Sequence, residues 1–394
     1  MAEKNEQVAE YRQTQKCSLS ELVKELERQK DAKVDFVADT RGVRVMVDQA
    51  GKLRLVPQDS RAGEWLPKDG APIKPTALTQ FGSKAEPEVP SQFMARLAAA
   101  RPQRAAELLN GLMADSPARR FVRVLDGQVR AFLSDRYRVL DNFDIAFAAL
   151  DAVRASGGEV IEAALSDTSM RLKFTSRAIW DAIELKQRGD KGNWYAGGLG
   201  NQEHLQRVNA RTGGDLPGGP GTIHPLITVH NSETGHGGFA VRFGIVQAIC
   251  FNLATVEEMV GKVHLGERLS VGIYAEETIS QESKAIYMKA RDAVRAAFNP
   301  EHFKRIVAMA QKAQGEQVTA PTAAAENVAK AAGLSDKSKD VLLGFFIRDY
   351  DQTRYGMAQA VARLAQEEPE AEKTAELEDL AGKLLRGEVA LAAA

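Results

Sequence analysis

Residues 121–142 read FVRVLDGQVRAFLSDRYRVLDN, and this stretch decides the fold that we expect for the centre of the chain. Asp126-Gly127 lies between two runs of alternating apolar residues, which is the strongest short-range signal for a two-residue β-hairpin. With these two residues as the loop, Arg123 faces Arg130 across the hairpin, and side chains alternate between its two faces. The pattern therefore predicts an antiparallel hairpin with a core face and a second face that carries arginines.

The arginine face allows two interpretations. Two like charges that oppose each other across a strand pair cost a few tenths of a kcal/mol, so an anion should offset them. In the first interpretation the arginines pair with Asp126, Asp135, Asp141 or an acid on a neighbouring strand. In the second, guanidinium groups bind phosphates and neighbouring aromatic rings stack on bases. The second interpretation assigns nucleic-acid contacts to Arg123, Arg130, Arg136, Arg138, Tyr137, Phe121 and Phe132.

Further cations fall on regular faces of other predicted elements. A strand at 170–175 places Arg171 and Lys173 opposite its apolar side chains, and a strand at 239–243 does the same for Arg242. A sheet with one basic face is what a binding platform for a single strand needs, although it is also what a solvated sheet face looks like. A helix at 276–298 carries Lys284, Arg291 and Arg295 away from its apolar stripe, either as a solvated face or as a phosphate contact.

Composition excludes several classes of protein. The 394 residues carry a net charge of −1, so any attraction to nucleic acid must come from local patches. Cys17 and Cys250 lie far apart, which gives neither a disulfide framework nor a zinc motif. We find no signal peptide, no run long enough for a membrane span, and no motif for a metal or cofactor. The glycine-rich stretch 186–222 reads as a long loop, and the bacterial cytoplasm is the expected location.

The whole chain reads as an α+β protein, with antiparallel β-hairpins packed on helices in the centre and a helical C-terminal third. Ser18 and Glu21 predict a capping box that opens a helix, and Asp141 is the expected N-cap of a helix from Asn142. The stretch 245–260 is expected to be helical. We expect three units: an N-terminal helix with a small hairpin at 1–57, a central α+β domain at 76–265, and a helical region at 275–394.

Four passages resemble a family of phage- and plasmid-encoded proteins built on an uncharacterised domain. They are PTALTQFGS with the following LLNGL (75–113), FVRVLDGQVRAFLSDRYRVLDN (121–142), ITVHNSETGHGGFAVRFGIVQAICFN (227–252) and TRYGMAQAVARLAQ (353–366). The resemblance implies a mobile genetic element in a bacterial cytoplasm, and it implies no activity and no catalytic residues. That setting favours proteins that handle DNA, which is an argument from association alone.

The leading hypothesis is a non-catalytic protein that binds or anneals single-stranded nucleic acid as a homo-oligomer, in recombination or replication. A protein-binding factor that acts on a host defence or replication protein is the alternative. A metal-dependent nuclease is the second alternative, with carboxylates drawn from Asp135, Asp141, Asp144 and Glu233. An electrostatic surface separates the three, because each needs a different group of side chains to be exposed together.

Overall fold

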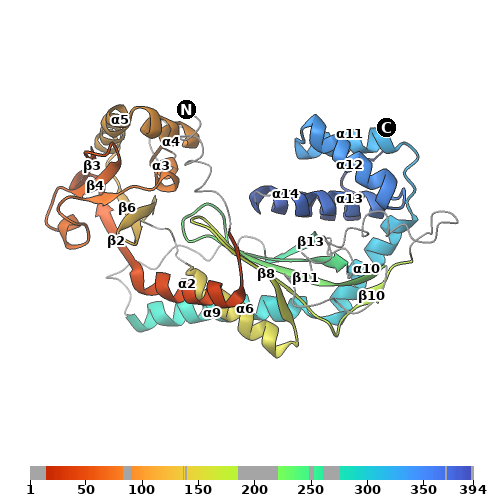
Figure 1. The fold of residues 1–394 in the computed structure, drawn as a ribbon. Helices are drawn as coiled ribbons and strands as arrows, with labels where there is room; N and C mark the ends of the chain where they lie inside the picture. Colours follow the sequence, from red (N-terminus) through yellow and green to blue (C-terminus); the bar gives the residue numbers. More distant parts are fainter. Residues whose placement is uncertain are drawn as a thin grey trace.

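The computed structural model of the chain describes residues 15–82, 90–135, 137, 140–184, 221–247, 253–260, 276–368 and 371–391. These residues form an N-terminal lobe and a larger unit built around a twisted antiparallel sheet (Figure 1). Helices α2, α6 and α9 lie along one side of the large sheet, and α13 and α14 lie along the other (Figure 1). The architecture is mixed α+β with a helical C-terminal region, as the sequence predicts.

The N-terminal lobe holds two small sheets and three helices around one apolar core. One sheet has the order β2-β6-β7 and the other β3-β4-β5. Phe36, Leu55 and Phe132 are among the side chains buried between them. The elements are β2 (Lys33–Asp39), β3 (Val43–Val47), β4 (Leu53–Pro57), β5 (Ala71–Pro72), α3 (Pro75–Gly82), α4 (Ser91–Ala100), α5 (Pro102–Asp115), β6 (Arg119–Leu125) and β7 (Gln128–Ser134), with single 3-10 turns at Thr40–Gly42 and Ala62–Glu64. Because β2 pairs with β6, residues on both sides of the expected 57–76 boundary share one sheet.

The Asp126-Gly127 hairpin forms as predicted, but its register changes after two residue pairs. Asp126 and Gly127 have φ angles of 52° and 71°, the left-handed conformation that a two-residue turn of type I′ requires. Val124 pairs with Val129, yet Arg123 pairs with Ala131, so Arg130 is the extra residue of a β-bulge. The predicted pairing of Arg123 with Arg130 is therefore wrong, and the residues that follow the bulge exchange faces.

The large sheet has the order β1-β8-β9-β11-β12-β13, and every pairing in it is antiparallel. The short strand β10 pairs with the first two residues of β11, ahead of the part of β11 that pairs with β9. Its apolar face, with Phe174, Ile227 and Phe243, belongs to the main hydrophobic core. The strands are β1 (Gln15–Cys17), β8 (Glu159–Leu165), β9 (Met170–Thr175), β10 (Asp181–Ala182), β11 (Thr222–Asn231), β12 (Ala240–Gln247) and β13 (Leu253–Val260).

The predicted helix at 245–260 is wrong where the structure describes it. Residues up to Gln247 continue β12, and Leu253–Val260 form β13, which pairs with β12. A short apolar run fits a buried strand and a buried helix equally well, and pairing with a distant strand decides between them.

Eight helices among the described residues pack on the large sheet or on one another. The capping box at Ser18 and Glu21 is confirmed, with both reciprocal hydrogen bonds present. Asn299 caps the helix that follows α9, and Pro300 occupies the first position of that helix. The helices are α2 (Leu19–Ala32), α6 (Asn142–Ala155), α9 (Glu276–Ala297), α10 (Pro300–Gly315), α11 (Pro321–Ala332), α12 (Asp336–Asp349), α13 (Arg354–Glu367) and α14 (Ala371–Arg386), in addition to α3–α5 of the lobe.

Candidate nucleic-acid interface

Arg123 of β6 lies inside the junction between the two parts of the molecule. Its side chain has no solvent exposure. Nε and Nη2 donate to the Asp35 carboxylate at 2.9 and 2.7 Å, and Nη2 also reaches Asp141 at 2.9 Å. Nη1 donates to the backbone carbonyl of Glu233 at 2.9 Å. A guanidinium whose donors are used in this way is a structural cross-link in this conformation, because its binding atoms are already occupied.

Glu233, on the turn between β11 and β12, pairs with two more cationic side chains of the N-terminal lobe. Arg130 donates to its Oε2, and Lys33 donates to its Oε1 at 2.6 Å. The backbone N–H of Asn142 donates to the same Oε1 at 2.5 Å. Burial raises the pKa of Glu233, but Arg130, Lys33 and Arg123 outweigh that effect and lower it below its usual range. The carboxylate is therefore held charged.

The start of α6 differs from the expectation for Asp141. Asp141 occupies the N-cap position, but its side chain makes no capping hydrogen bond. It bonds instead to Arg123 and to Lys33, at 2.9 and 3.2 Å. Glu233 supplies the acceptor for the first helical N–H in its place. One carboxylate thus caps α6 from another strand pair while it joins the lobe to the large sheet.

The interpretation in which the hairpin arginines pair with acids is confirmed for Arg123, which meets Asp141 and Asp35 of the neighbouring strand. Arg130 is also paired, but with Glu233 on a distant turn that the sequence did not indicate, and the described arginines of the hairpin form no exposed face. Three cations, Lys33, Arg123 and Arg130, meet the carboxylates of Asp35, Asp141 and Glu233. We call these six residues the junction cluster. Its charges balance, and a buried balanced cluster offers little field to an outside anion.

The aromatic side chains of the hairpin are not free to stack on bases either. Phe121 and Phe132 are each 2% exposed, and Phe132 stacks on Phe81 with ring centroids 3.7 Å apart. Tyr137 is half-buried, and its hydroxyl donates to the carbonyl of Ser232 at 3.1 Å. Arg136 and Arg138 lie outside the described residues.

The basic face predicted for the large sheet exists, and it is covered. Lys173, Thr228 and Arg242 lie in register across three strands. Lys173 is fully buried, with its Nζ 2.7 Å from Glu378 of α14 and 3.1 Å from Glu162. Burial alone lowers the pKa of Lys173, yet Glu162 and Glu378 raise it above its usual value. Arg171 is buried and Arg242 half-buried, so the expectation of an open platform is wrong for this face.

Among the described residues of the expected binding surface, the exposed cations are those on α9. Ala290, Val294 and Ala297 face the core, as the apolar stripe predicts. Lys284 and Arg295 are exposed on the opposite side, and Arg291 is half-buried beside Asp292, 3.2 Å away. Exposed Lys289, which was not among the predicted contacts, adds a further positive charge. Local helical spacing was enough to find this surface.

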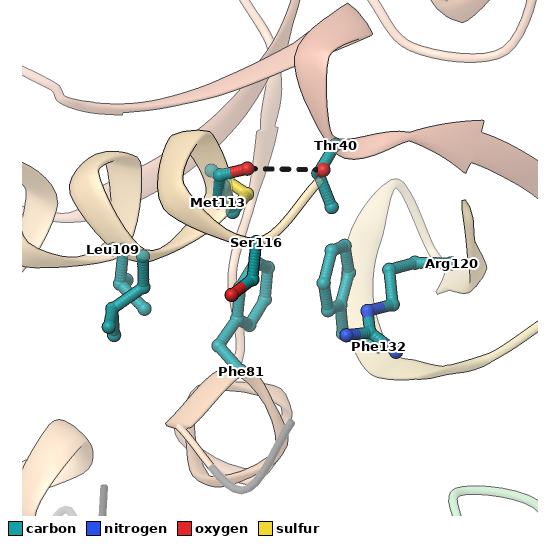
Figure 2. Close-up of a pocket in the computed structure, with 8 residues that line it drawn as sticks. Thr40, Phe81, Leu109, Met113, Ser116, Arg120 and Phe132 are labelled. Atoms are coloured by element: carbon teal, nitrogen blue, oxygen red, sulfur yellow. Dashed lines mark hydrogen bonds between the residues drawn. The ribbon is translucent and has the colours of Figure 1, made fainter. Parts of the chain in front are cut away.

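A small pocket in the N-terminal lobe has a different character (Figure 2). It encloses about 280 Å³ including its open mouth, and Figure 2 shows Phe81, Phe132 and Arg120 at its wall. Burial lowers the pKa of Arg120, although the charge of Asp135 opposes the shift. Arg120 already has an interaction partner, so its charge is not free for a ligand in the pocket.

Metal and membrane signals are absent from the described part of the chain. No group of three or more His, Cys, Asp or Glu side chains there is arranged to hold a metal ion, and this includes the carboxylates drawn together for a nuclease. No helix within the described ranges is long and apolar enough to cross a membrane.

Comparison with known proteins adds no relative. No family model, no curated protein and no solved structure matches the chain. The resemblance to phage- and plasmid-encoded proteins therefore stays a prediction.

Proposed function

We propose that the protein binds nucleic acid through its phosphate backbone, with α9 as a contact surface. One observation carries the proposal: Lys284, Lys289 and Arg295 are all exposed on α9, with Lys284 and Arg295 on one side of the helix and Lys289 on another. From 284 to 295 the sequence contains four cations and one acid, and that acid pairs with Arg291. A cationic surface of this kind attracts phosphates whatever the base sequence.

The dimensions of the surface suit a backbone contact. Lys284 and Arg295 are eleven positions apart in the sequence, which corresponds to about 16 Å along a helix. Arg291 contributes less to the field, because Asp292 neutralises it. The proposal does not involve the junction cluster or the covered face of the large sheet, because the cations there are already paired with carboxylates.

The salt dependence of binding tests the proposal. A fluorescent single-stranded oligonucleotide is titrated with the wild-type protein and with the triple variant Lys284→Ala, Lys289→Ala, Arg295→Ala over a range of salt concentrations. Each lost phosphate contact lowers the slope of log affinity against log salt by about 0.7, so the triple variant should lose about 2. Lower affinity with a smaller slope supports the proposal.

A matched control removes the same number of charges from other helices. Lys304, Lys339 and Lys383 already pair with Glu301, Asp336 and Asp379, at 2.9, 3.0 and 2.9 Å. The triple variant Lys304→Ala, Lys339→Ala, Lys383→Ala should keep the wild-type slope. Equal losses in the two triple variants would reduce the effect to net charge, and absence of binding at low salt would overturn the proposal.

A further inference from the structure

The corner between α4 and α5 combines an exposed aromatic ring with three arginines. Phe93 of α4 is 47% exposed, and Arg96 follows three residues later on the same helix face. Arg101 and Arg104 are also exposed, and residues 90–106 contain no Asp or Glu. A single exposed apolar ring is common on protein surfaces, so the combination of this ring with three exposed arginines is the feature that points to a ligand.

Local stability does not explain the arginines. The residue before a proline is disfavoured in a helix, so Arg101-Pro102 ends α4 and starts α5. Arg101 and Arg104 then stand at the positive end of α5, where cations are unfavourable, and the first turn of α5 contains no acid. Arg104 reaches Glu107 at 2.9 Å in an exposed pair, and Arg96 reaches Gln92 at 3.3 Å. Such exposed contacts contribute little.

Charge distinguishes Phe93 from the other exposed aromatic side chains. Trp65 is 48% exposed, and the acid Glu64 is its direct neighbour in sequence. Trp180 is 55% exposed and is followed by Asp181. Acids repel a phosphate backbone, and the acid nearest to Phe93 in sequence is Glu88, five positions away. Among the exposed aromatic side chains of the described residues, Phe93 therefore has the surroundings that best favour one.

We propose that the α4–α5 corner binds single-stranded nucleic acid, with Phe93 stacked on an unpaired base and Arg96, Arg101 and Arg104 at the phosphates. In a duplex the base faces are covered by their neighbours, so an exposed ring has nothing to stack on. A single strand offers both a free base face and a flexible backbone. This inference deepens the proposed function, because it names the class of nucleic acid, and it rests on that function for its physiological meaning.

The corner and α9 are separate surfaces. In Figure 1 α4 and α5 lie at the top of the N-terminal lobe, whereas α9 runs along the bottom of the molecule. A short oligonucleotide therefore occupies one surface at a time, and a long one is needed to contact both. Variants at the corner and variants on α9 can then be tested independently.

The experiment compares two short probes with equal numbers of phosphates. One is an oligothymidine of about eight nucleotides, within the range that such sites cover, and the other is an abasic oligomer of the same length. Phe93→Leu keeps an apolar side chain and removes the aromatic ring. It should weaken oligothymidine binding roughly 5- to 150-fold and leave the abasic oligomer unchanged. Trp180→Leu, at an exposed ring beside acids, should change neither affinity.

Arginine variants test the phosphate contacts of the corner. Arg96→Ala with Arg101→Ala should weaken both probes and lower the salt slope by about 1.4. Equal binding of oligothymidine by wild type and Phe93→Leu would overturn the inference, and the α9 triple variant would still report on the proposed function. Tighter binding of a duplex than of a single strand of the same sequence would also overturn it. Circular dichroism confirms that each exposed-site variant is folded.

Discussion

Arg130 of the N-terminal lobe donates a hydrogen bond to Glu233 of the turn between β11 and β12, 103 residues further along the chain. Arg130 is the extra residue of the β-bulge, and the bulge lets its guanidinium share Glu233 with Lys33. The contact joins the two parts of the molecule through charges that are almost wholly withdrawn from water. Removing one partner of such a pair leaves the other buried without compensation.

Glu233→Gln should therefore lower the free energy of unfolding by about 3 to 5 kcal/mol, since Arg130 and Lys33 would lose their shared carboxylate. Urea denaturation followed by circular dichroism measures the change. Asp336→Asn is the control, because Asp336 is 96% exposed and pairs with Lys339 on the surface. It should cost less than about 1 kcal/mol. Equal effects of the two substitutions would contradict a structural role for the junction cluster.

Acid should weaken the fold through His230. Burial, together with Arg171 and Arg242, lowers the pKa of this imidazole from 6.5 to about 4 against the opposing bond to Gly238. The unfolded chain therefore takes up a proton at a higher pH than the folded chain. Stability from this residue is complete above pH 6.5 and is lost as pH falls from 6.5 towards 4. The loss between pH 7 and pH 5 should approach about 2 kcal/mol.

The pH effect is measured by urea denaturation at pH 7 and pH 5 for wild type and His230→Gln. Glutamine does not titrate, so the variant should lose less stability over this interval. An equal pH dependence in both proteins would assign the effect to other groups.

Substitution of two glycines by alanine tests whether the Asp126-Gly127 turn needs a left-handed backbone: Gly127 lies in the turn, and Gly111 lies inside a helix. Gly127 has a φ of 71° with nothing near an added Cβ, so Gly127→Ala meets only backbone strain and should destabilise by about 1 to 2 kcal/mol. Gly111, inside α5, also has open space around it. Gly111→Ala should stabilise by about 0.5 to 1 kcal/mol. Thermal unfolding compares the two, and a common sign would refute the assignment of the turn.

The buried Lys173–Glu378 pair should couple α14 to the large sheet. Lys173→Met leaves Glu162 and Glu378 without their cation and should cost about 3 to 5 kcal/mol. Adding Glu378→Gln should cost less than the sum of the single changes, with a coupling of about 1 to 3 kcal/mol. A double-mutant cycle in urea provides the number, and strict additivity would show that the pair is energetically unimportant.

Local sequence patterns predicted much of the fold, but they did not predict that the arginines of the candidate site are buried and paired. The predicted hairpin, the capping box at Ser18 and the exposed cations of α9 depend on residues within a few positions of one another. The bulge at Arg130 and the strand at 253–260 depend on distant partners. A single inserted bulge residue exchanges the faces of all positions beyond it, which is why Phe132 lies in the core of the lobe and not beside Arg123.

The sequence by itself determined the turn at Asp126-Gly127, because few residues accept the left-handed backbone there, and it determined the starts of α2 and α6. It also placed Arg123 and Arg130 on one side of a hairpin. Only the tertiary structure decided what those arginines meet. Their carboxylate partners come from β2, from the start of α6 and from the β11–β12 turn. Periodicity carries no information about which distant segment closes over a charged face, so burial turned an expected binding surface into an internal cross-link.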